Sequence, residues 1–101
     1  MPFSWTINID PDKPQPPLAK FDPNPLTQVA PGDQIFWANN DGTAHWPGLL
    51  NPNGSINETY FIPNQIAPNS TSDAFSPSAA ATLNYACSIH PDETGTIQVQ
   101  G

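Results

Sequence analysis

The sequence has few basic residues. Lys13 and Lys20 stand against nine acidic residues, so the formal net charge is −7. Binding to nucleic acid or to an anionic membrane surface needs clustered lysines and arginines, so both functions are excluded. No apolar run approaches the roughly 20 residues that cross a bilayer, and we expect no membrane insertion. The negative charge favours a protein partner with a basic docking surface.

Cysteine and helix-compatible sequence are also scarce. Cys87 is the only cysteine, so no disulfide can form within the chain. Fourteen prolines are spread over 101 residues. One proline inside a helix costs about 3 kcal/mol, which excludes an all-α fold. Aromatic residues make up 10% and favour a packed core over disorder. The length allows one domain, which we expect to cover residues 1–101.

Short segments with alternating polarity predict β-strands. The first is residues 3–9, which place four apolar side chains on one face. Turn residues bound four further segments of strand length, namely 26–29, 34–39, 83–87 and 95–99. Weaker signals predict strands at 60–62 and 73–76, and a helical turn at 79–81. We expect the proline-rich stretch 10–25 to be an irregular connection. Six to eight short strands predict an all-β fold, an antiparallel β-sandwich or barrel.

Three potential metal ligands follow or end predicted strands. Cys87 ends one strand, His90 lies three residues later, and His45 follows the turn after an earlier strand. One thiolate and two imidazoles form a soft donor set that suits copper or zinc. Ordinary roles are the alternative: a small core residue for Cys87, a surface or core histidine for His45, and a turn residue for His90. Spacing alone leaves both interpretations open.

Two motifs resemble those of the cupredoxins, such as plastocyanin and amicyanin. Residues 85–91 (YACSIHP), followed by 95–99, are similar to the C-terminal copper loop of that family. Residues 32–41, followed by His45, resemble the strand and turn that deliver its first histidine ligand. The resemblance implies a Greek-key β-sandwich with one mononuclear copper, Cu(I) or Cu(II). On this resemblance the equatorial ligands would be His45, Cys87 and His90.

The fourth ligand departs from the family pattern. Blue-copper members place a weak axial methionine shortly after the second histidine. The only methionine here is Met1, and the matching position holds Glu93. A carboxylate is a hard, anionic donor that would favour Cu(II) and lower the reduction potential. In this one ligand the chain resembles nitrosocyanin, the red copper protein with an axial glutamate. The alternatives are a solvated Glu93, with copper three-coordinate or bound to water or a carbonyl, or a ligand role for Asp92.

Three residues are expected around the ligands. Trp46 sits where cupredoxins supply a backbone N–H to the cysteine sulfur. Ile89 occupies a position often filled by proline in that family, so its N–H is free to act as a second donor. Asn39 matches an asparagine that ties the two ligand loops together in the family, although an ordinary turn asparagine would look the same.

The resemblance implies a small soluble copper protein that transfers single electrons with a redox partner. The sequence contains nothing that resembles a nucleophile–base pair, a phosphate loop or paired carboxylates with basic partners, so we do not expect a conventional enzyme. A periplasmic or otherwise extracytoplasmic location is expected on the same ground. Two other functions stay open. A red-copper site with a vacant position could bind or transform a small molecule such as nitric oxide or a peroxide. A storage or delivery module would bind copper without redox cycling.

Overall fold

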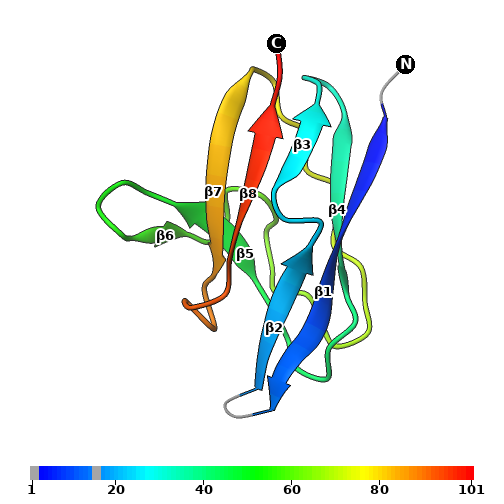
Figure 1. The fold of residues 1–101 in the computed structure, drawn as a ribbon, viewed down its shortest axis with the longest axis vertical. Helices are drawn as coiled ribbons and strands as arrows, with labels where there is room; N and C mark the ends of the chain where they lie inside the picture. The colour runs from blue at the N-terminus through cyan, green and yellow to red at the C-terminus, as the bar shows by residue number, and fades with distance from the viewer. Residues whose placement is uncertain (1–2, 15–16) are drawn as a thin grey trace.

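The chain folds into two β-sheets that pack face to face (Figure 1). The computed structural model describes residues 3–14 and 17–101, so Met1 lies outside it. It contains eight strands: β1 (Ser4–Pro14), β2 (Pro17–Asp22), β3 (Leu26–Val29), β4 (Gln34–Asn39), β5 (Pro47–Leu50), β6 (Ile56–Asn57), β7 (Ala81–Cys87) and β8 (Thr94–Val99). One sheet has the order β2-β1-β4 and the other β3-β8-β7-β5-β6. The predicted all-β sandwich is confirmed.

Alternation of apolar and polar residues accounts for the core. Ile7 and Ile9 of β1 are fully buried, as are Ile35 and Trp37 of β4. Ile7 pairs with Trp37 in the register of these two strands. The strands run parallel, and so do β3 and β8, while the other strand pairs run antiparallel. The sheets are therefore mixed and not purely antiparallel.

The expected irregular connection over residues 10–25 is wrong for most of its length. Here β1 continues to Pro14 and pairs antiparallel with β2. A proline lacks the N–H that a central strand needs, but beyond Ile9 the strand β1 pairs with β2 alone, because its register with β4 ends at Ile9 and Asn39. Among the described residues each strand of this hairpin therefore has one ladder neighbour, and its other edge accommodates the prolines.

Other differences lie in the long segment between β4 and β7. Tyr60 and Phe61 lie in a turn and Ile62 in no regular element, and 73–76 contribute one isolated bridge, between Phe75 and Ile35. The expected helical turn at 79–81 is absent, since β7 begins at Ala81. Strand β5 was not predicted, because it begins with Pro47 and Gly48 and its apolar and polar residues do not alternate. Its conformation comes from pairing with β7 on one side and β6 on the other.

The pairing of β5 with β7 positions the candidate site. Pro47 pairs with Cys87, so the residues just before β5 lie beside the loop that follows β7. Figure 1 shows this β7–β8 loop at the opposite end of the sandwich from the C-terminus. Among the described residues, no helix is long and apolar enough to span a bilayer.

Candidate metal centre

Four side chains converge at this end of the sandwich. The ligand atoms of His45, Cys87, His90 and Glu93 all lie within 4.8 Å of one another. Cys87 Sγ is 3.7 Å from His45 Nδ1 and 3.8 Å from His90 Nδ1. Glu93 Oε1 is 3.0 Å from His45 Nδ1 and 3.6 Å from His90 Nδ1. The four residues expected as ligands are therefore together.

A tight turn returns the chain from His90 to Glu93. The N–H of Glu93 donates to the carbonyl of His90 at 2.9 Å, which closes a four-residue turn with Pro91 at its second position. The N–H of Cys87 donates to the carbonyl of Glu93, also at 2.9 Å. These two bonds fold the loop back on itself. As a result, one loop supplies three of the four donors.

Glu93 is buried although it is a loop carboxylate. Its side chain is 1% exposed, and the N–H of Ala19 donates to Oε2 at 2.6 Å. Its Oε1 is buried and has no hydrogen-bond partner, although two imidazole nitrogens lie nearby. A buried carboxylate oxygen is unfavourable unless a cation compensates it, and a protonated His45 or a bound metal ion would supply that cation. Asp92, the rival candidate, is exposed and does not belong to the cluster.

His45 is held on both sides and through its backbone. Its backbone N–H and carbonyl both bond to Ile66. Its side chain is 0% exposed, with Nε2 2.8 Å from Asp41 Oδ2. Burial lowers the pKa of the ring, but the neighbouring Cys87, Glu93 and Asp41 outweigh burial and raise that pKa to about 10. A metal ion would therefore displace a proton from Nδ1.

Cys87 is fully buried, and its sulfur accepts one backbone hydrogen bond. The donor is the N–H of Trp46, at 3.3 Å. The carbonyl of Trp46 accepts from Ser88 N–H at 2.8 Å, so this residue links the two loops that carry the ligands. Within residues 3–14 and 17–101, no bond joins the N–H of Ile89 to the sulfur. The side chain of Ile89 is instead exposed at the surface.

Asn39 was expected to link the two loops that carry the ligands, but its side chain makes other hydrogen bonds. Its side-chain amide donates to three carbonyl oxygens, those of Thr43, Ile66 and Ala67. Its Oδ1 accepts the N–H of Asp41 at 3.0 Å. Asn39 therefore shapes the loop before His45 and ties it to the segment around residue 66.

Asp41 is the residue near the ligands that sequence reasoning missed. Its carboxylate accepts from Gly42 N–H at 2.8 Å and from Thr43 Oγ1 at 3.0 Å, in addition to its contact with His45. Burial raises the pKa of this carboxyl, but these hydrogen bonds outweigh burial and lower it overall. An acid four residues before a loop histidine was the signal available in the sequence.

The donor set fits a metal ion. It contains two imidazole nitrogens, a thiolate and a carboxylate oxygen, a combination suited to copper or zinc. Three of these residues are buried, whereas the His90 side chain is 26% exposed. A bound ion would thus be shielded from water and would approach the surface at the His90 ring.

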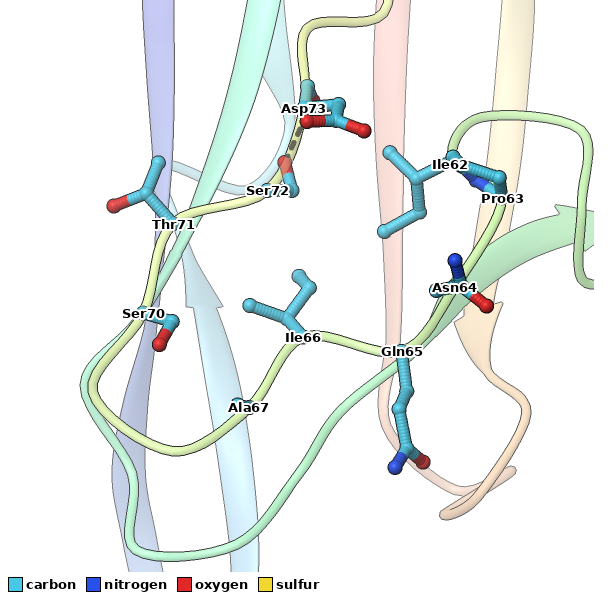
Figure 2. Close-up of a pocket in the computed structure, with 10 residues that line it drawn as sticks. All are labelled: Ile62, Pro63, Asn64, Gln65, Ile66, Ala67, Ser70, Thr71, Ser72 and Asp73. Atoms are coloured by element: carbon cyan, nitrogen blue, oxygen red, sulfur yellow. Dashed lines mark hydrogen bonds between the residues drawn. The ribbon is translucent and has the colours of Figure 1, made fainter.

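A separate pocket of about 240 Å³ lies beside this centre and contains none of the four side chains. Figure 2 shows it inside a bend of the chain, with Ile62 and Ile66 extending into the space and Gln65 pointing away. The remaining lining residues are polar or small: Pro63, Asn64, Ala67, Ser70, Thr71, Ser72 and Asp73. The backbone of Ile66 joins this wall to His45.

No protein family matches the sequence, and no curated protein matches it. Solved structures do match. A purple cupredoxin from Nitrosopumilus maritimus is 20% identical, with a TM-score of 0.78 over 94% of this chain and 98% of its own. Amicyanin from Paracoccus versutus is also 20% identical, with a TM-score of 0.71 over 96% and 81%. A reduced Cu(I) form of an amicyanin variant is 22% identical, with a TM-score of 0.68 over 94% and 82%. The chain therefore has the cupredoxin fold.

Proposed function

We propose that this protein binds one copper ion and exchanges single electrons with a protein partner. The observation that supports this most directly is the meeting of His45, Cys87, His90 and Glu93 within 4.8 Å in a cupredoxin fold. Copper alternates between Cu(I) and Cu(II), so a bound ion supplies one-electron chemistry. We assign the whole chain, residues 1–101, to one copper domain.

The four side chains would share the binding. The thiolate of Cys87 and the Nδ1 atoms of the two histidines supply soft and intermediate donors. Glu93 offers Oε1 as the fourth donor, while its Oε2 is held by Ala19. An anionic oxygen stabilises Cu(II) more than Cu(I), so the reduction potential is lower than with a methionine ligand.

The surface near His90 is the proposed route for electrons. The ring is partly exposed, and Ile89 beside it is 42% exposed. An apolar side chain at the metal-proximal surface suits a small, transient protein interface. The net charge of −7 would speed encounter with a basic partner. Likeness to cupredoxins supports a periplasmic or otherwise extracytoplasmic location.

The absorption spectrum of the copper-loaded protein tests the proposal. Thiolate-to-copper charge transfer gives an intense band near about 600 nm with a weak fourth ligand, or near about 400 nm with strong ligation. We expect the carboxylate to shift intensity toward the shorter wavelength. Cys87→Ser should remove this colour and leave the β-sandwich folded, as judged by circular dichroism. A colourless protein that takes up zinc and no copper would overturn the proposal.

Two results would point to the other functions. Tight copper binding without electron exchange with a soluble redox dye would indicate storage or delivery. A spectrum that changes on addition of nitric oxide or peroxide would indicate a vacant, reachable coordination position. The wild-type protein suffices for both measurements.

A further inference from the structure

Both ring nitrogens of His45 face a carboxylate. Nδ1 lies 3.0 Å from Glu93 Oε1, on the side of the metal centre. Nε2 lies 2.8 Å from Asp41 Oδ2, on the opposite side of the ring. The ring is fully shielded from solvent, and the Asp41 side chain is 12% exposed. Water therefore competes little with the contact between Asp41 and His45.

Hydrogen bonds other than the one to His45 fix the position of the Asp41 carboxylate. Its Oδ1 accepts the N–H of Gly42, and its Oδ2 accepts the hydroxyl of Thr43. The backbone N–H of Asp41 is itself bound by Asn39 Oδ1. With its other contacts satisfied in this way, Oδ2 presents an acceptor at one defined position. When a metal ion displaces the proton from Nδ1, an anionic acceptor at this position holds the remaining ring proton on Nε2 and keeps the Nδ1 lone pair directed at the metal.

We propose that Asp41 is a positioning residue for the metal centre, which fixes the orientation and tautomer of His45 and lowers the reduction potential of bound copper. The inference rests on the proposed copper site. Negative charge transmitted through the imidazole makes Nδ1 a stronger donor. A stronger donor stabilises Cu(II) more than Cu(I), and Asp41 acts in the same direction as Glu93.

Asp41→Asn tests the role of the charge, since the variant keeps an oxygen that can accept from Nε2. Loss of an outer partner of a ligating histidine costs about 10–100-fold in metal affinity. We expect a loss in this range for Cu(II) and a smaller loss for Cu(I), each measured by competition with a chelator. A tenfold difference between the two losses raises the reduction potential by about 59 mV. Asp73→Asn removes the same charge from an exposed site and serves as the matched control.

A measurement on the wild type covers the case in which Asp41→Asn does not fold. In the zinc-loaded protein, nitrogen-15 NMR should show His45 with its proton on Nε2, protected from exchange with water. A proton on Nδ1, or rapid exchange at Nε2, would overturn the inference. So would unchanged copper affinities and potential in a folded Asp41→Asn variant. A wild type that binds neither copper nor zinc would overturn the proposed function together with this inference.

Discussion

The backbone N–H of Ala19 donates to Glu93 Oε2 at 2.6 Å, although 74 residues separate the two in sequence. Ala19 belongs to β2, an edge strand of the smaller sheet, and Glu93 to the loop of the other sheet. One carboxylate oxygen is thus held by the N-terminal hairpin, while the other points to the imidazoles. The hairpin therefore determines which oxygen of Glu93 is available to a metal ion.

Ala19→Pro should release Glu93 by removing this N–H. Proline is tolerated at an edge strand where the N–H does not serve the sheet, so we expect the variant to fold. The freed carboxylate becomes a weaker or more variable ligand, and the charge-transfer intensity of the copper form should move toward about 600 nm. Ala19→Gly keeps the N–H and is the control. Identical spectra for the two variants would mean that the bond has no influence on ligation.

Glu93→Met should produce a site closer to that of blue copper proteins. A thioether is a softer and neutral donor. It therefore stabilises Cu(I) relative to Cu(II), and the reduction potential rises. The charge-transfer band should shift to longer wavelength, so that the colour of the protein changes from red toward blue. Voltammetry and absorption on the same sample measure both effects. If neither quantity differs from wild type, Glu93 is not a ligand of the copper ion.

The sequence predicted strands from two signals, alternating burial and bounding turns. The predicted segment 34–39 coincides with β4, whose burial alternates along the chain. The segment 26–29 coincides with β3, whose burial does not alternate and which was predicted from the turn residues that bound it. The predicted strand 3–9 forms the first part of β1. β5, β2 and residues 10–14 of β1 were missed, because these residues become strands through pairing with other segments and not through local pattern. Prolines in these strands also argued against them.

The same distinction holds at the metal centre. His45, Cys87 and His90 were found because they are the chain's only histidines and cysteine and lie in motifs that resemble the cupredoxin ligand loops. Glu93 was found because it holds the position of the axial methionine in that pattern. The contact of Asp41 with His45 depends on a loop curling back toward its own histidine. No periodic pattern in the sequence predicts this loop conformation, so Asp41 was interpreted as an ordinary turn residue.

Gly95→Ala should destabilise the sandwich through the residue opposite it. Gly95 pairs with Tyr85 across β7 and β8, and a Cβ at this position would overlap the tyrosine ring. That ring is fully buried, with its centroid 4.8 Å from that of Phe21 and 5.6 Å from that of Trp37, so it has no free space to enter. Overpacking of this kind costs about 1–3 kcal/mol.

Urea denaturation would measure the loss in free energy of unfolding. Gly42→Ala is the matched control, because a Cβ there has no neighbour within 4 Å. A Gly95→Ala variant as stable as Gly42→Ala would show that β7 and β8 shift apart without cost.

Asp33 anchors the first strand to the turn before β4. Its carboxylate accepts from Trp5 Nε1 at 2.9 Å, from Ala30 N–H at 2.9 Å and from Phe3 N–H at 3.0 Å. These donors, Trp5 foremost, hold the pKa of Asp33 below its ordinary value of 3.8. The ionised carboxylate therefore stabilises the folded state above that value. The stabilisation is lost as the pH falls through the lower pKa of the folded state.

Asp33→Asn should therefore lower the free energy of unfolding at neutral pH, since an amide cannot accept all three bonds and its NH₂ group faces donors. The difference from wild type should shrink as the pH is lowered below about 4, where the carboxyl of the wild type begins to bind a proton. Thermal unfolding of the metal-free proteins between neutral and acidic pH measures this trend. Asp12→Asn, at an exposed position, should show no such trend. A destabilisation by Asp33→Asn that stays constant down to the lowest pH would mean that its charge contributes nothing and that only shape matters at this turn.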